Sequence, residues 1–259
     1  MQVNGGKRRE CYKYKTKPYL KPVHLELFMK HVAMDQDTKY KSVFCEELFD
    51  KPARVIVVGA SNVGKSCFIN KLIKKYSNKF TDIVISGSFK SDLQQCEEVK
   101  NKVKIHADGL YNPFLDYDPI EEESLRERHV LLFYDDCMSS FMNSKIGADI
   151  FFKGRHYSFS VVVTLQNYFY KGVEAQTIRG QATHLVLFKI RNIHQVSTLS
   201  RTLESGKDRI QRFLDIYNKY VLNRKYGYIA IFLDCDDLTR YRTELVNERG
   251  LYDTVIKFV

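Results

Sequence analysis

The chain has 259 residues, 44% of them hydrophobic and 28% charged, a composition that excludes disordered and collagen-like chains and is typical of globular proteins with a sizeable core. No uncharged apolar run reaches the roughly 18 residues that a membrane-spanning helix needs, and no apolar segment follows the basic N-terminus as in a secretory signal. The six cysteines lie far apart without a CxxC pair, which argues against a disulfide framework or a structural zinc site. We expect reduced, mostly packed thiols in a protein of the cytosol or nucleus, without a membrane partner.

The charge balance is basic, with 41 Lys and Arg against 31 Asp and Glu, a net charge of +10. Such an excess favours a polyanionic partner such as nucleic acid. The first 21 residues carry seven Lys or Arg against Glu10 alone, so a solvated basic tail is the alternative explanation for much of the excess. Three basic stretches are candidates for contact with DNA, although solvated surfaces explain each of them as well: residues 7–21, 71–79 and 219–225.

The composition changes near residue 51, which predicts two parts: a basic arm with a short helical extension over residues 1–50, including a helix at 24–32, and one main domain over 51–259. Beyond residue 51, short runs rich in Val, Ile and Phe alternate with longer segments of helical spacing, which predicts a mainly parallel sheet with helices on both faces. The expected strands are 54–58, 83–86, 130–134, 160–165 and 184–189. The expected helices are 65–76, 90–101 and 193–220. Segments 228–233 and 240–246 are expected to form a hairpin at the sheet edge.

Residues 59–66, GASNVGKS, match the pattern GxxxxGK[ST] between an expected strand and an expected helix, which is the context of a P-loop. Gly59 and Gly64 allow a tight turn whose N–H groups, with the helix N-terminus, form a site for phosphates. We expect Lys65 to contact the β and γ phosphates and Ser66 to bind Mg²⁺; a glycine-rich turn with an incidental lysine is the alternative. The nucleotide-binding candidates are Gly59, Ser61, Asn62, Val63, Gly64, Lys65, Ser66 and Cys67.

Hydrolysis at a P-loop also needs a carboxylate at the end of a neighbouring strand. The run VLLFYDD supplies Asp135, expected in the metal shell, and Asp136, expected to polarise the attacking water. The run IAIFLDCDD, which places Asp234 at a strand end, is the alternative and is disfavoured because it lies near the end of the chain. The strand at 160–165 delivers Thr164 and then Gln166, whose amide is suited to sensing the γ-phosphate and the water, although a strand-ending Gln without a role fits the spacing equally well.

In chain order, the segments GASNVGKS, LLFYDD, GRHYSFSVVVTLQ and TIRGQATHLVLFKIRN resemble the DNA-packaging ATPases of eukaryotic DNA viruses and Polinton-type elements, the poxvirus-type branch of the FtsK/HerA superfamily. The resemblance covers roughly residues 54–245. It implies an ASCE-type P-loop fold in which the Gln strand separates the P-loop strand from the acidic strand. It also implies ATP and Mg²⁺ as cofactors, movement of double-stranded DNA, a homo-oligomeric ring, and capsid or portal partners at sites of virion assembly. Many superfamily members have Glu where this chain has Asp136.

In a ring, a cation from the neighbouring subunit can stabilise the charge that develops on the γ-phosphoryl group. We expect Arg155, in the polar turn before the Gln strand, to act in this way, with Arg179 at the start of the next strand as the alternative and a structural salt bridge open for either. Two other functions remain possible: a GTPase switch, which the missing [NT]KxD motif disfavours, and a nucleotide-regulated DNA-binding protein that is not a motor.

Overall fold

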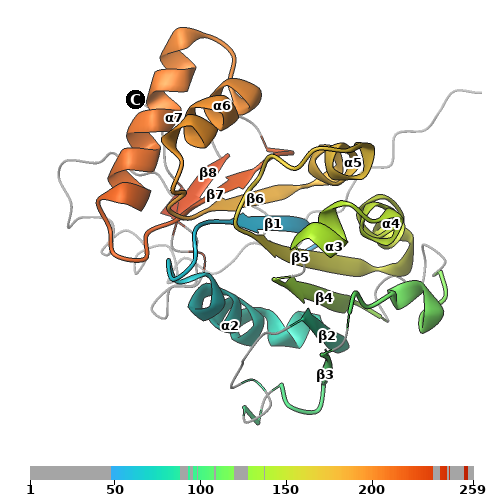
Figure 1. The fold of residues 1–259 in the computed structure, drawn as a ribbon. Helices are drawn as coiled ribbons and strands as arrows, with labels where there is room; N and C mark the ends of the chain where they lie inside the picture. The colour runs from blue at the N-terminus through green and yellow to red at the C-terminus, as the bar shows by residue number, and fades with distance from the viewer. Residues whose placement is uncertain are drawn as a thin grey trace, which may run out of the picture. The chain divides into compact units, whose positions relative to one another are not determined.

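The described strands form one mixed sheet in the order β3-β2-β4-β5-β1-β6-β7-β8-β9 (Figure 1). The computed structural model describes residues 48–87, 93, 96–97, 99–107, 109–119, 128–136, 138–235, 240–243, 245 and 254–255, all within one compact unit, Tyr40–Val259. The strands are β1 Arg54–Val58, β2 Asp82–Gly87, β3 Val103–His106, β4 Val130–Asp135, β5 Phe159–Leu165, β6 His184–Leu187, β7 Ile229–Phe232, β8 Tyr241–Thr243 and β9 Thr254–Val255. The expected helix at 24–32 lies outside the described residues.

The first six strands of that order run parallel, and β7, β8 and β9 each run antiparallel to the preceding neighbour. The order places β5, the expected Gln strand, between β4 and β1, as the resemblance implied. The expected mainly parallel sheet is therefore confirmed, together with the β7–β8 hairpin.

Helices cover both faces of the sheet. Alternation along β1 sends Val55 and Val57 into one apolar core with Phe68 of α2, and Ile56 and Val58 into a second core on the other face. In Figure 1, α2 lies on one side of the sheet and α3 to α7 on the other. The α-helices are α2 Lys65–Tyr76, α3 Met138–Met142, α4 Lys145–Lys153, α5 Val173–Gln181, α6 Ile193–Leu203 and α7 Lys207–Tyr217. Short 3-10 helices occupy η2 Ser77–Lys79, η4 Pro113–Leu115 and η6 Gly154–Tyr157, and the π-helix is η7 Asn218–Leu222.

Several expected boundaries were wrong. The helix predicted over 193–220 is two helices, because the chain turns at Gly206, whose φ of 91° is left-handed and favours glycine. The strand predicted over 184–189 ends at Leu187. Most of the helix predicted over 90–101 lies outside the described residues. Among the helices that the structure describes, none has the length and hydropathy needed to cross a lipid bilayer.

Candidate functional site

The loop between β1 and α2 has the backbone of a phosphate-binding turn. Asn62 and Gly64 have φ values of 64° and 99°, and α2 begins directly after Gly64. A left-handed turn before a helix N-terminus directs N–H groups toward an anion. Gly59 is needed for a different reason, since a Cβ there would lie 2.5 Å from the Cβ of Phe188, the residue that follows β6. The two glycines therefore serve turn geometry and close packing respectively.

The Lys65 side chain lies within the loop. Its Nζ donates to the carbonyl oxygens of Gly59 and Ala60, at 2.7 Å each. Burial lowers the pKa of the Lys65 ammonium, and the nearby charges of Asp135 and Asp136 oppose that shift. An anionic ligand stabilises the charged form of a partly buried ammonium whose pKa burial has lowered. The position of Lys65 therefore suits a polyphosphate bound in front of the loop.

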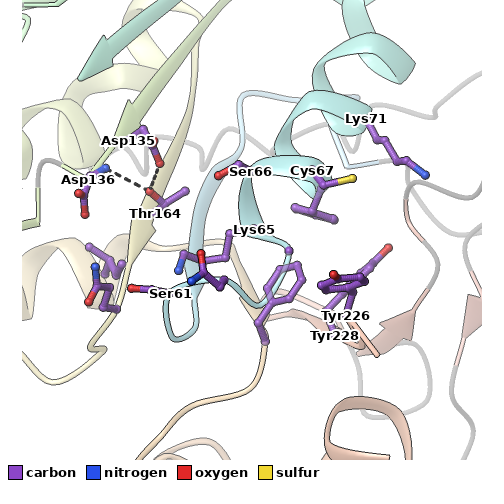
Figure 2. Close-up of a pocket in the computed structure, with 16 residues that line it drawn as sticks. Ser61, Lys65, Ser66, Cys67, Lys71, Asp135, Asp136, Thr164, Tyr226 and Tyr228 are labelled. Carbon is purple, nitrogen blue, oxygen red and sulfur yellow. Dashed lines mark hydrogen bonds between the residues drawn. The ribbon is translucent and has the colours of Figure 1, made fainter. Parts of the chain in front are cut away.

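The acidic end of the site is built by two neighbouring strands. Asp135 ends β4, and its carboxylate accepts a 2.6 Å hydrogen bond from the Thr164 hydroxyl on β5. The Asp136 backbone N–H donates to the same hydroxyl oxygen at 3.3 Å, and the Asp136 φ of 52° turns the chain there. Burial raises the pKa of Asp135, whereas the bond from Thr164 and the charge of Lys65 lower it. Thr164 therefore fixes both aspartates relative to β5 (Figure 2).

One cavity of about 840 Å³ collects these groups, a volume within the range of small-molecule sites. Nine of the predicted site residues line it: Ser61, Asn62, Gly64, Lys65, Ser66, Cys67, Asp135, Asp136 and Gln166. Of the other predicted residues, Gly59 supports the loop through an N–H bond to the Leu165 carbonyl, and Val63 lines a neighbouring cleft. The cavity thus joins the ends of β1, β4 and β5.

Comparison with known proteins identifies the family. A family model described as Poxvirus A32 protein matches residues 40–236, which is most of the chain. The chain belongs to the poxvirus A32 family. This assignment confirms the resemblance drawn from the sequence, to the poxvirus-type branch of DNA-packaging ATPases. No curated protein matches the chain.

Solved structures resemble the fold of this A32-family chain. The genome packaging NTPase B204 from Sulfolobus turreted icosahedral virus 2, in complex with ATPγS, has a TM-score of 0.50 at 14% identity and covers 71% of this chain and 94% of its own. The DNA-packaging ATPase B204 from Sulfolobus turreted icosahedral virus has a TM-score of 0.49 at 12% identity, covering 71% and 94%. The cytoplasmic domain of the Type VII secretion ATPase EccC from Thermomonospora curvata has 0.44 at 8%, covering 72% and 25%. The first likeness supports the P-loop fold.

Two residues named in the sequence analysis, the alternative carboxylate Asp234 and the expected trans-acting Arg155, lie away from the cavity in this A32-family fold. Asp234 follows β7, which runs antiparallel to β6, so it lies at the edge of the sheet opposite the P-loop, close enough to Arg54 at the start of β1 to influence its pKa. Arg155 is exposed in η6, directly before β5, and is also at the edge where the parallel strands begin. Neither residue lines the cavity.

Arg179 was expected at the start of a strand, and that placement was wrong. It lies in the last turn of α5, where its guanidinium donates to the carbonyl of Tyr170 at 2.9 Å and to that of Tyr168 at 3.4 Å. The same group lies over the Tyr168 ring, 5.7 Å from the centroid. Arg179 therefore stabilises, within its own chain, the loop that follows Gln166 through hydrogen bonds to two of its backbone carbonyls.

The sequence analysis missed the aromatic wall of the cavity, which Phe68, Phe188, Tyr226 and Tyr228 provide. No motif marks these residues, and the repeated Tyr in the segment YGY was the only local signal. The expectation of packed thiols also failed at Cys67, which is exposed and lines the cavity. All three cysteines that the structure describes are unpaired.

Proposed function

We propose that the cavity binds ATP with Mg²⁺ and hydrolyses the γ-phosphate bond to drive double-stranded DNA into a capsid. One observation carries the proposal: β1, β4 and β5 bring Lys65, Ser66, Asp135, Asp136 and Gln166 into a single cavity. A phosphate-binding loop, a metal-facing carboxylate, a second carboxylate and an amide are the parts that P-loop hydrolysis requires.

Each side chain receives one role. The loop backbone and Lys65 hold the phosphates. Asp136 accepts the proton of the attacking water as the bond from that water to the γ-phosphorus forms, while the bond between the γ-phosphorus and the β,γ-bridging oxygen breaks and ADP leaves. Gln166, which follows β5 between β4 and β1, orients that water and senses whether the γ-phosphate is present. Thr164 keeps the two aspartates in register through its hydroxyl. These assignments follow from the chemistry of the groups and their shared cavity.

The residues present fit Mg²⁺. Among the described residues, no group of three or more His, Cys, Asp or Glu could hold a metal by itself. Mg²⁺ in phosphate sites instead uses one or two protein oxygens together with phosphates and water, and the Ser66 hydroxyl and the Asp135 carboxylate both line the cavity. When bound, the ion would neutralise charge on the phosphates.

A packaging ATPase also needs partners. The net charge of +10 suits contact with DNA phosphates without base readout, and we place the chain at sites of virion assembly in the host, as a homo-oligomeric ring with capsid or portal proteins. In that ring, exposed Arg155 would reach the nucleotide of the neighbouring subunit, because it lies at the sheet edge opposite its own cavity. We further propose a basic arm with a short helical extension over residues 1–50 and an ATPase domain over 51–259.

The proposal is tested by steady-state hydrolysis of ATP and GTP by the full chain, with and without duplex DNA. We expect Mg²⁺-dependent ATP turnover that DNA stimulates. Turnover confined to GTP would instead support a switch, and absence of turnover in an assembled ring on DNA would contradict the motor.

The trans role of Arg155 has a separate test. Arg155→Ala should reduce turnover about a thousandfold, the scale of such groups, with little change in ATP affinity. Mixing this variant with Lys65→Ala should restore part of the activity, because the Arg155 of one chain then serves the intact loop of the other. Absence of rescue in a ring shown to contain both chains would refute the assignment.

A further inference from the structure

The cavity is longer than the phosphate site. Asp135 and Asp136 lie at one end, Lys65 lies in the middle, and Cys67, Lys71, Tyr226 and Tyr228 lie at the other end (Figure 2). If the γ-phosphate faces the carboxylates, as the proposed function requires, the chain of phosphates leads toward the second end. The ribose and the base of the nucleotide must then occupy the end with the two tyrosines.

We propose that Tyr226 is the platform on which the base of the bound nucleoside triphosphate stacks, an inference that rests on the proposed function. Tyr226 is 60% exposed, although its ring lies against the P-loop: a Cβ on Gly64 would come within 3.1 Å of the Tyr226 Cδ1 and 3.2 Å of its Cβ. The Cβ and Cδ1 side of Tyr226 therefore lies against the loop that holds the phosphates, while most of its side chain remains exposed and lines the cavity.

The backbone around Tyr226 is built to hold it there. Tyr226 has a φ of 59°, a left-handed conformation that is strained for a bulky residue and is found mainly where a function maintains it. The next residue has to be glycine, since a Cβ on Gly227 would lie 2.2 Å from the Tyr220 carbonyl oxygen of the π-helix η7. Isolated π-helical turns are themselves frequent at functional sites. The left-handed backbone of Tyr226 and the close packing of Gly227 against η7 therefore fix the backbone that carries the exposed ring.

Recognition at this end relies on stacking. Tyr228 adds a second aromatic ring to this end of the cavity, and its ring centroid lies 4.8 Å from that of Phe68 and 5.3 Å from that of Phe188. The charged groups at this end are Lys71, which lines the cavity, and Lys225, whose Nζ lies 5.3 Å from the Tyr226 centroid. Of the carboxylate and amide side chains that line the cavity, Asp135 and Asp136 lie at its other end. The amide of Asn62 belongs to the P-loop itself and lines both the cavity and the neighbouring cleft together with Tyr226. Stacking tolerates every base and favours the larger purines, so ATP and GTP should bind with similar affinity.

Removal of the ring tests the proposal. Isothermal titration of the full chain should show that Tyr226→Ala weakens ATP binding roughly 5- to 150-fold, the range for loss of one base–aromatic stack, whereas Tyr226→Phe binds like the unchanged chain. Inorganic tripolyphosphate, which lacks a base, should bind both variants equally. Phe152→Ala is the matched control, because Phe152 is an aromatic residue of similar exposure, 55%, on α4 away from the cavity.

A spectroscopic test uses the absence of tryptophan from the sequence. Tyr226→Trp introduces a single indole at the platform, and its fluorescence should be quenched by ATP but not by tripolyphosphate. The indole of Phe152→Trp should respond to neither. Unchanged ATP affinity in Tyr226→Ala would overturn the proposal, and so would equal loss of ATP and tripolyphosphate binding, which would mean that the ring only supports Gly64. Failure of the unchanged chain to bind either ligand would overturn the proposed function itself.

Discussion

Removal of one hydroxyl from β5 should alter the pH dependence of hydrolysis. Thr164→Val deletes the 2.6 Å hydrogen bond to the Asp135 carboxylate and the acceptor for the Asp136 N–H, while the branched side chain keeps its shape in a position that is 3% exposed. A hydrogen bond to a charged group contributes about 1.5–3 kcal/mol. Since one pKa unit corresponds to about 1.4 kcal/mol, the pKa of Asp135, already raised by burial, should rise by about one to two further units.

The sign of the effect follows from the role of the carboxylate. In its proposed role, Asp135 binds the metal only when it is ionised, and its ionised fraction is lost as the pH falls through its pKa. A higher pKa therefore moves the acidic limb of the kcat/KM profile to higher pH by about one to two units, and turnover at fixed pH near that limb should need more Mg²⁺. The assay is ATP hydrolysis across pH and Mg²⁺ concentration.

Thr183→Val is the matched control. Thr183 is also buried, 8% exposed, and its hydroxyl bonds the backbone N–H and carbonyl of Arg54 at the opposite edge of the sheet. It should lower the free energy of unfolding by about 1 kcal/mol without moving the pH profile. An unshifted profile in a folded Thr164→Val protein would refute the role of the Thr164 hydroxyl, and an equal shift in both variants would show a general effect of stability.

Three further predictions concern the cavity and the core. Lys65→Ala should abolish turnover and weaken nucleotide binding in a folded protein, because the substitution removes the ammonium group that contacts the β and γ phosphates. Hydrolysis at the unchanged rate would contradict the site. Asp136→Asn should keep Mg²⁺-dependent ATP binding but stop hydrolysis, whereas Asp135→Asn should impair that binding, and identical titrations for the two would contradict the division of roles. Burial holds the pKa of His129 at about 4, so the unfolded chain, with its ordinary pKa of about 6.5, binds the extra proton. Stability should therefore be full above about pH 6.5 and fall toward pH 4 by about 3 kcal/mol, and His129→Gln should flatten this part of the unfolding curve.

The chemistry of His129 shows why this proton is unfavourable. The Nε2 atom lies 2.7 Å from the Ser160 hydroxyl oxygen, which also accepts the Ala53 N–H. The hydroxyl proton is then directed at Nε2, and the other ring nitrogen bonds the Lys79 backbone. Protonation at Nε2 would place a hydrogen against that hydroxyl. His184, whose pKa burial lowers to about 3, titrates over an overlapping pH range, so one substitution should remove only part of the acid sensitivity.

The sequence predicted the parts of the site that depend on local pattern. The Walker A loop, the strand ending at Asp135 and the strand before Gln166 each combine an apolar run with a polar residue at its end, and the carboxyl ends of parallel strands meet at one edge. Other features depend on the assembled fold. β3 is a half-exposed edge strand of four residues, too short and too mixed in polarity for its sequence to predict a strand. The role of Arg179 in α5 could not be predicted either, because it depends on hydrogen bonds to the carbonyls of residues 168 and 170, which only the folded chain brings beside it.

The direction of β7 explains why the sequence alone could not separate Asp234 from Asp135, and why it did not reveal Tyr226 as a cavity residue. Asp234 ends an apolar run as Asp135 does, and pattern alone cannot separate them. Because β7 runs antiparallel to β6, its C-terminal end carries Asp234 to the edge opposite the P-loop, whereas its N-terminal end brings the preceding loop to the nucleotide edge. That loop holds Tyr226. The antiparallel direction of β7 therefore places the carboxylate of Asp234 away from the cavity and places the ring of Tyr226 in its lining. Strand direction is a property of the assembled sheet, which joins residues far apart in the sequence, so the local pattern around either residue does not reveal it.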